Sequence, residues 1–332
     1  MRWGIIGAGD IARKQTGPAI RELPGADLHA VACRALPRAR AVADELGAVK
    51  AYDSAEALLA DPEIEAVSIS TPVYLHARQT IAAARAGKHV LVEKPMAMST
   101  VECRTMIDAC ERHGVQLMVC YYQRFNARHQ HARALVQQGA IGRVTFAETR
   151  QGSLRPPNPG DWKQDPAQAG GGAMMDLAVH GIDTLRFVLG EVRAVSAVIE
   201  TAVFDYPVDD TATVLLHFEN GAQGVVRAAF TVASVEPESF ASLELSGTGG
   251  RIWTWPLWSK DSGGVFRLLT PDGEQPFSIH QPTHPALIRA FEESVRHHRE
   301  SPVPGSEGLR GMAVVEAAYQ SARTGRTVPV SP

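Results

Sequence analysis

The sequence predicts an α/β protein with two domains: a doubly wound Rossmann domain, then an α+β domain with a mostly antiparallel open sheet. Its 332 residues suit two domains of about 100–200 residues each. The first part alternates short apolar runs with helical patterns, which is typical of βαβ units and a parallel sheet. The second part carries long alternating runs and the tight-turn pair Asn220-Gly221, which predict antiparallel hairpins. We therefore expect domains at residues 1–121 and 122–332.

The first domain is expected to alternate strands and helices throughout. Ser54 and Ser99 precede helical patterns, where a serine hydroxyl satisfies free backbone N–H groups. Gly47, Gly87 and Gly114 stand just past helix ends, where a left-handed residue is favoured. The expected strands are residues 3–7, 28–33, 66–70, 89–92 and 116–120. The expected helices are residues 10–23, 37–46, 54–59, 74–86 and 99–113.

The second domain is expected to combine a few helices with an open sheet. The expected helices are residues 128–138, 174–189, 285–298 and 306–324, and the last two are expected to pack back on the body of the protein. The expected strands are residues 144–151, 192–203, 211–218, 222–229, 242–245 and 265–269. We expect Trp253, Trp255 and Trp258 in the sheet core or an interface. The open face of the sheet is a candidate surface for a homo-oligomer.

Composition and charge exclude two classes of partner. The net charge is −3 and no run of Lys or Arg occurs, which argues against a nucleic-acid partner and against binding to a membrane surface. No stretch of about 18 apolar residues is present, so no membrane-spanning helix is expected. The expected partner is therefore a small molecule.

Cysteine usage and the N-terminus favour the cytoplasm. Cys33, Cys103, Cys110 and Cys120 form no CxxC pair, which argues against a structural zinc site and fits a reducing compartment. The first apolar stretch is short and leads straight into a glycine turn, unlike a signal peptide.

A glycine-rich loop follows the first expected strand. Gly7, Ala8, Gly9, Asp10, Ile11 and Ala12 fit the pattern GxGxx[G/A] between a strand and a helix. Glycines allow a tight turn and a close backbone approach to a pyrophosphate, and the helix start supplies N–H groups. The pattern alone is weak, but its strand–turn–helix context predicts a dinucleotide site.

The end of the second expected strand indicates which dinucleotide binds. An NAD site usually places Asp or Glu there to hold the ribose 2′-hydroxyl. This chain has Cys33 and Arg34, with Arg38 one turn later, and two guanidinium groups suit a 2′-phosphate. The alternative is that both arginines are solvated surface residues. We favour NADP(H) and keep NAD(H) open.

Two further sets of residues have chemistry suited to hydride transfer. Lys94 follows a parallel strand at the edge where such sheets bind ligands, and its ammonium can stabilise a negative oxygen. Asp176 and His180 have helical i, i+4 spacing, which puts a carboxylate beside an imidazole. Taken alone, each is more typical of a surface residue. Two ligands of this kind also make a poor metal site.

Several motifs taken together resemble one family. The loop 7–12, Ser70-Thr71-Pro72 with Leu75 and His76, and Glu93-Lys94-Pro95 are similar to motifs of the glucose–fructose oxidoreductase, inositol dehydrogenase and rhizopine-catabolism (Gfo/Idh/MocA) family. The run 170–172 with Asp176 and His180 matches it too, so the resemblance covers nearly the whole chain. Within the family, residues 170–172 and 183–189 are most similar to a sugar-reductase branch.

The resemblance implies a site. It makes Lys94, Asp176 and His180 the catalytic set, with no metal required. The resemblance and the positions after the strands together give the expected cofactor-binding residues: Gly7, Ala8, Gly9, Asp10, Ile11, Cys33, Arg34, Arg38, Ser70, Thr71, Pro72, Leu75, His76, Glu93, Lys94, Arg124, Trp162 and Lys163. Arg124 is included because it follows the expected strand 116–120, and the alternative is a surface arginine. The implied substrate-binding residues are Lys94, Trp162, Asp176 and His180. Tyr122 follows the expected strand 116–120 and is included as a residue that could line the cleft; the alternative is a buried aromatic residue. Lys163 stands where reductase members have Arg, so bidentate pairing is lost there.

We therefore expect an NADP(H)-dependent oxidoreductase acting on a sugar, keto-sugar or polyol. One alternative is an NAD-dependent dehydrogenase of the inositol or xylose type. Another is a non-catalytic dinucleotide sensor, although retention of Lys94, Asp176 and His180 favours an enzyme. His129 and His131 have metal-like spacing, but they lie in a polar helix and are expected to be solvated.

Overall fold

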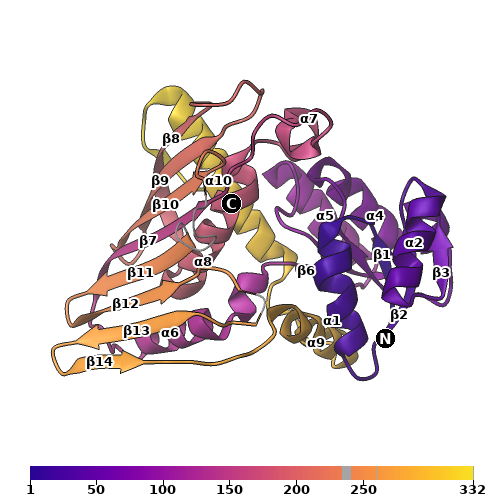
Figure 1. Ribbon diagram of the computed structural model, residues 1–332, viewed down its shortest axis with the longest axis horizontal. Helices are drawn as coiled ribbons and strands as arrows, with labels where there is room; N and C mark the ends of the chain where they lie inside the picture. The colour runs from indigo at the N-terminus through magenta and orange to yellow at the C-terminus, as the bar shows by residue number, and fades with distance from the viewer. Residues whose placement is uncertain (234–240, 260, 332) are drawn as a thin grey trace. The chain divides into compact units, whose positions relative to one another are not determined.

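The computed structural model describes residues 1–233, 241–259 and 261–331. It divides into two compact units. The first unit comprises Met1–Cys120 and His284–Leu309, and the second comprises Tyr121–Thr283 and Arg310–Pro332. Each unit has its own sheet (Figure 1).

The first unit is built on a six-stranded parallel sheet with the order β3-β2-β1-β4-β5-β6. Its strands are β1 (Arg2–Ile6), β2 (Asp27–Ala32), β3 (Lys50–Tyr52), β4 (Ala66–Ile69), β5 (His89–Val92) and β6 (Leu117–Val119). The strand order reverses between β1 and β4, and doubly wound sheets bind ligands at such a point, beyond the carboxyl ends. The predicted Rossmann architecture is confirmed, although the short edge strand β3 was not predicted.

The helical segments of the first unit are η1 (Ala12–Thr16), α1 (Gly17–Glu22), α2 (Leu36–Leu46), α3 (Ala55–Leu59), η2 (Val73–Leu75), α4 (His76–Arg85), α5 (Thr100–Arg112) and α9 (Thr283–Arg296). Ser54 and Ser99 cap the starts of α3 and α5, and Gly47 ends α2 in the left-handed conformation, as the sequence predicts. Ser99 Oγ accepts the Glu102 N–H while the Glu102 carboxylate accepts the Met98 N–H, so α5 starts with a reciprocal cap. Helix α9 is tied to the sheet because Trp3 Nε1 donates to Glu292 Oε1 at 2.8 Å.

The second unit contains a nine-stranded sheet with the order β14-β13-β12-β11-β7-β10-β9-β8-β15. Its strands are β7 (Val144–Gly152), β8 (Val192–Glu200), β9 (Thr211–Phe218), β10 (Gln223–Ala229), β11 (Ala241–Gly247), β12 (Gly250–Trp255), β13 (Val265–Thr270), β14 (Gly273–Pro276) and β15 (Val328–Pro329). Only β7 and β10 pair in parallel within the described sheet. The predicted mostly antiparallel sheet is confirmed, and Asn220-Gly221 forms the β9–β10 hairpin.

Helices of the second unit carry the residues of interest here. They are η3 (Tyr122–Phe125), α6 (Ala127–Gln137), η4 (Trp162–Gln164), α7 (Pro166–Ala169), η5 (Met174–Ala178), α8 (Val179–Leu189) and α10 (Gly305–Thr324), which begins in the first unit. Helix α8 packs on β7 and β10 and against α6. Gly181 makes this close packing possible, because a Cβ there would overlap the Thr149 hydroxyl.

The prediction that His129 is solvated was wrong. Its side chain is fully buried on α6, and its Nδ1 lies 3.1 Å from the Gln123 carbonyl oxygen. Burial, together with the nearby Arg128 charge, lowers the pKa of His129 to about 3. His131 stacks on the ring of Phe277 with 4.0 Å between centroids. The polar composition of α6 conceals these contacts with neighbouring elements.

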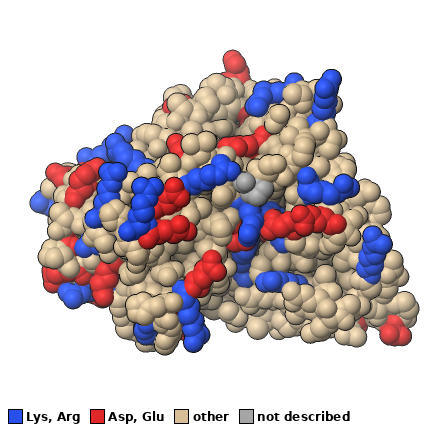
Figure 2. Space-filling view, turned by 180° about the vertical axis from the view of Figure 1, so that it is seen from behind, with Lys and Arg blue, Asp and Glu red and all other residues tan. Residues whose placement is uncertain are grey.

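The surface agrees with the weak net charge. Acidic and basic side chains are interspersed on the face drawn in Figure 2, and no broad region of one sign appears among its coloured residues. Among the described residues, no helix has the length and apolar character needed to cross a membrane.

Candidate active site

The glycine loop of the first unit begins where β1 approaches β4. Gly7 has φ +112°, a conformation that favours glycine, and its N–H donates to the Ala32 carbonyl at 2.8 Å. A Cβ at Gly7 would overlap the carbonyl oxygen of Ser70. The first glycine is therefore required by the fold itself, before any ligand is considered.

The next part of the loop fits a dinucleotide phosphate. No described atom lies within 4 Å of a Cβ built at Gly9, so the backbone is open to approach there. The π-helix η1 follows, and no side chain caps its start in the described structure. Asp10 is exposed and pairs with Lys14 at 2.7 Å. A helix start that the protein leaves uncapped suits an anion.

The end of β2 carries two basic side chains and no acidic one. Cys33 Sγ lies 3.2 Å from the Ala35 carbonyl oxygen, and Arg34 is exposed. Arg38 Nε donates to the carbonyl oxygen of Ala8 at 3.1 Å, which ties its guanidinium to the glycine loop. The predicted pair Arg34 and Arg38 therefore follows β2, and Arg38 contacts the loop directly.

His76 joins the loops that follow β4 and β5. Its Nε2 lies 2.9 Å from the Thr71 carbonyl oxygen and its Nδ1 lies 3.0 Å from that of Pro95. The ring is 1% exposed, and burial lowers the pKa of His76. Gln79 Oε1 accepts the Thr71 hydroxyl at 2.7 Å and fixes the same loop. The structure thus places His76 as a link between two loops.

Lys94 stands on the second of these loops, two residues after β5. It is half-buried, as is Glu93, whose Oε2 accepts the Lys94 N–H at 3.2 Å. Ser70, Thr71, Pro72 and Leu75 are also half-buried on the loop after β4. Because β1, β2, β4 and β5 are parallel, the residues that follow them gather at one edge of the sheet.

In the second unit, Lys163 holds the carboxylate of Asp176. Asp176 lies in the π-helix η5, and Lys163 lies in η4 beside Trp162. The Lys163 Nζ is 2.9 Å from Asp176 Oδ1 and 2.8 Å from Oδ2. Both side chains are largely buried, with 28% and 16% exposed. This contact fixes the Asp176 side chain against η4.

His180 lies at the start of α8, one turn beyond Asp176. It is 5% exposed, and its ring packs edge-on against Tyr122 with 5.4 Å between centroids. The helix over Asp176 is a π-turn rather than the regular α-helix that the i, i+4 spacing predicts, and single π-turns are frequent at functional sites. The second unit therefore brings together Tyr122, Lys163, Asp176 and His180 from η3, η4, η5 and α8.

Arg124 is used within the second unit. Its Nε lies 3.0 Å from Asp183 Oδ1 and its Nη2 lies 2.6 Å from the same oxygen. Asp183 is 1% exposed, so the pair is a buried ion pair that holds η3 against α8. This contact gives Arg124 a structural role besides the predicted cofactor contact.

The glycine run and its partners include residues that sequence reasoning missed. A Cβ at Gly172 would overlap the backbone of Asp209, and one at Gly171 would overlap the Tyr319 hydroxyl. Asp209 precedes β9 and Tyr319 lies on α10, far from the run in sequence. Only the acidic pair Asp209-Asp210 before a strand offers a local signal, and nothing local marks Tyr319.

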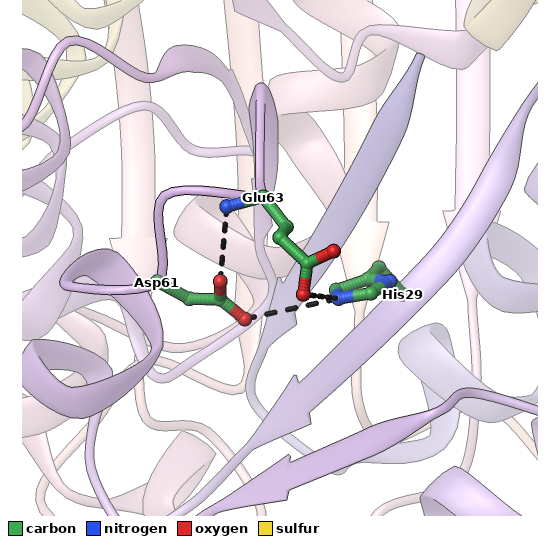
Figure 3. A group of neighbouring side chains, drawn as sticks. All are labelled: His29, Asp61 and Glu63. Atoms are coloured by element: carbon green, nitrogen blue, oxygen red, sulfur yellow. Dashed lines mark hydrogen bonds and ion pairs between the residues drawn. The ribbon is translucent and has the colours of Figure 1, made fainter.

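Three side chains of the first unit, His29, Asp61 and Glu63, lie close enough together to resemble a metal site, but Lys50 contacts both of the carboxylates. His29 Nε2 lies 3.3 Å from Glu63 Oε2 and 3.8 Å from Asp61 Oδ2 (Figure 3). Lys50 Nζ contacts both carboxylates, at 2.9 Å from Asp61 Oδ2. Although burial acts to raise it, the Glu63 N–H and the Lys50 ammonium lower the pKa of Asp61 to about 2. Lys50 therefore supplies the cation that these carboxylates require.

Models of one family match both parts of the chain. The model described as "Oxidoreductase family, NAD-binding Rossmann fold" matches residues 1–121. The model described as "GFO/IDH/MocA C-terminal domain" matches residues 129–253. Together they cover most of the sequence.

Named relatives match over the full length. A 1,5-anhydro-D-fructose reductase of Ensifer adhaerens is 32% identical, over 99% of this chain and 98% of that protein. D-xylose 1-dehydrogenase (NADP(+)) 2 of Haloferax volcanii is 33% identical, over 99% of each. The crystal structure of an aldose-aldose oxidoreductase from Caulobacter crescentus, complexed with glycerol, superposes with a TM-score of 0.91 at 30% identity, over 99% of each chain. The chain therefore belongs to the Gfo/Idh/MocA family of oxidoreductases, as its motifs predict.

Proposed function

We propose that this protein is an NADP(H)-dependent oxidoreductase that interconverts a carbinol and a carbonyl group on a sugar, keto-sugar or polyol, as the named relatives do with sugars. The observation that carries the proposal is the arrangement of Asp176 and His180. Lys163 contacts both side-chain oxygens of Asp176, and the imidazole of His180 follows one turn later. A carboxylate and an imidazole in this order suit a positioned proton donor and acceptor.

Each side chain has a distinct role in this proposal. His180 protonates the forming alkoxide in the reducing direction and takes the proton from the alcohol in reverse. Lys94 polarises the reacting oxygen, and Asp176 orients His180 and binds substrate hydroxyls. The nicotinamide supplies the hydride chemistry when the cofactor is bound. Gly7, Gly9 and the uncapped start of η1 would hold its pyrophosphate.

The choice of NADP(H) rests on the end of β2. Arg34 is exposed there, and Arg38 is fixed against the glycine loop by its bond to Ala8. Guanidinium groups pair well with a phosphate, and residues 33–38 include no carboxylate to repel one. The name of the Haloferax volcanii relative includes NADP(+), which supports the same choice. NAD(H) is the second candidate, since the matching family model is described as NAD-binding.

The experiment follows NADPH absorbance across a panel of keto-sugars, and NADP⁺ reduction across aldoses and polyols. We expect turnover in the panel, a lower KM for NADPH than for NADH, and a loss of kcat by about two orders of magnitude or more in Lys94→Ala and His180→Ala. His297→Ala, at an exposed histidine, is the matched control. Near-normal turnover of both site variants would refute the catalytic roles. Bound cofactor without turnover anywhere in the panel would favour a sensor.

The outer face of the second unit's sheet suggests an assembly. We include in the proposal that a second copy of the chain covers this face. Phe146 on β7 is 59% exposed and Val198 on β8 is 61% exposed. Light scattering of the wild type and of Phe146→Lys tests it, and a monomeric wild type would refute it. The free cysteines support a cytoplasmic location.

A further inference from the structure

The start of the helix that carries Asp176 and His180 is held from a distance by one carboxylate. Asp209 Oδ1 accepts the Gly172 N–H at 2.8 Å, and Oδ2 accepts the Met174 N–H at 2.7 Å. The Asp209 backbone oxygen also accepts the Ala173 N–H at 2.9 Å. The N–H groups of three successive residues at the start of η5 therefore all donate hydrogen bonds to Asp209. Orphan N–H groups at a helix start are usually satisfied by a local side chain or by water.

Tyr319 fixes the carboxylate in turn. Its hydroxyl donates to Asp209 Oδ1 at 2.7 Å. Burial and the Asp209 charge raise the pKa of Tyr319, so the hydroxyl keeps its proton and remains a donor. The same hydroxyl lies where a Cβ of residue 171 would be, and the Asp209 backbone lies where a Cβ of residue 172 would be. The glycines are what allow this pair to come so close to the helix start.

The π-turn gives this contact a consequence for the site. Asp176 lies within η5 and His180 lies just beyond it, so the register of η5 sets how the two side chains are oriented relative to each other. A π-turn is an uncommon conformation that depends on its surroundings. Asp209 binds the N–H groups at residues 172 and 174, on both sides of the point where η5 begins. Release of these N–H groups would free the turn to change register.

We propose that Asp209 and Tyr319 are positioning residues that fix the register of η5, and with it the alignment of Asp176 and His180; this inference rests on the proposed function. They act through the backbone of residues 172–174. A surface pocket of about 330 Å³ borders Asp209, Tyr319, Gly170 and Gly171. Water from this pocket can replace a lost hydroxyl as a partner of Asp209. The cost in stability is then small, while the fixed geometry is lost.

The test uses Tyr319→Phe and Asp209→Asn, each with a matched control. Tyr52→Phe removes a hydroxyl that donates to Asp61 at 2.8 Å in the first unit, so it deletes the same kind of bond elsewhere. Asp210→Asn changes the neighbouring carboxylate, which accepts the N–H groups of Ala202, Val203 and Phe204 instead. For each variant we measure kcat, KM, the Kd for NADPH, Tm, and hydrogen exchange of the peptide spanning residues 170–182.

We expect kcat to fall about tenfold in Tyr319→Phe and about a hundredfold in Asp209→Asn, because small misplacements of catalytic groups have effects of this size. The Kd for NADPH and the KM for sugar stay within about twofold, and amides 172 and 174 exchange faster. The controls keep wild-type kcat and exchange in this peptide. Equal kcat and equal exchange in Tyr319→Phe and Tyr52→Phe would overturn the inference, even if Asp209→Asn fails to fold. If the wild type turns over no sugar, the proposed function fails, and the exchange measurement still decides this inference.

Discussion

Glycines precede two helix starts in this protein, those of η1 and η5. The two starts differ in whether a side chain of the protein binds their backbone N–H groups. In the first unit, Gly7 and Gly9 lead into the π-helix η1, and no side chain in the described part of the chain caps its start. In the second, Gly170–Gly172 lead into the π-helix η5, and Asp209 binds N–H groups at its start. One start is left for an anion from outside, and the other is already filled by the protein's own carboxylate.

This difference separates binding from chemistry. A helix start carries partial positive charge and free N–H groups, and it attracts a phosphate only where the protein has not satisfied them. Because Asp209 already binds the N–H groups at the start of η5, that start is not available to a phosphate. The same hydrogen bonds fix the backbone that carries Asp176. Under the proposed function, the first start would hold the cofactor, and the second would support Asp176 and His180.

The largest expected effect comes from Gly172→Ala. The new Cβ would overlap the Asp209 backbone, so η5 or Asp209 has to move. We expect kcat to fall about a hundredfold or more, since Asp176 and His180 move with η5. The Kd for NADPH, measured by fluorescence titration, should stay near the wild-type value. An unchanged kcat, or NADPH binding weakened as much as kcat, would contradict the assignment of cofactor binding and proton transfer to different helix starts.

The complementary change in the first unit is Gly9→Ala, paired with Gly7→Ala. Gly9 has open space around a Cβ, whereas Gly7 has positive φ and meets Ser70. Gly9→Ala should leave Tm unchanged and weaken NADPH binding about tenfold, because the methyl group stands where the pyrophosphate approaches. Gly7→Ala should lower both Tm and affinity through backbone strain. Unchanged NADPH affinity in Gly9→Ala would refute the prediction that the pyrophosphate binds at this loop.

The start of η1 is easier to predict from the sequence than the start of η5. The pattern at residues 7–12 has local meaning, because strand, turn and helix follow one another within the motif. The fold class and family were predicted correctly for the same reason, from alternating elements and contiguous motifs. The catalytic and cofactor-binding roles of the candidate residues stay predictions.

The parts that escaped prediction depend on distant partners. Asp209, just before β9, and Tyr319, on α10, contact the glycine run from distant parts of the sequence, and no periodicity reveals such contacts. His129 is buried because α6 packs against neighbouring elements, which a polar helix sequence does not show. Strand β12 was missed because it begins at the second residue of the glycine pair 249–250 and ends just before Pro256, and glycine and proline are typical of turns.

A smaller loss of kcat is expected from a change at Lys163, which contacts the Asp176 carboxylate. This change tests whether the position of Asp176 matters for turnover. Lys163→Met removes both contacts to the Asp176 carboxylate. We expect kcat to fall about tenfold, as is typical for loss of a charge-assisted hydrogen bond. Lys163→Arg keeps the charge and should retain most of the activity. If Lys163 binds the cofactor instead, the methionine variant will raise the KM for NADPH and leave kcat unchanged.

The smallest expected effect is on the pH dependence of the free energy of unfolding, and it comes from His129. This residue of the second unit lies on α6, outside both helix starts. The folded pKa of His129 is about 3, against about 6.5 when unfolded. Between these values the unfolded chain binds a proton that the folded chain does not, so stability falls as the pH falls. The loss between pH 7 and pH 5 amounts to about 2 kcal/mol from this group. Urea unfolding at both pH values, followed by tryptophan fluorescence, should show this loss in the wild type and a smaller one in His129→Gln. An equal loss in both would mean that His129 already carries its proton in the folded state.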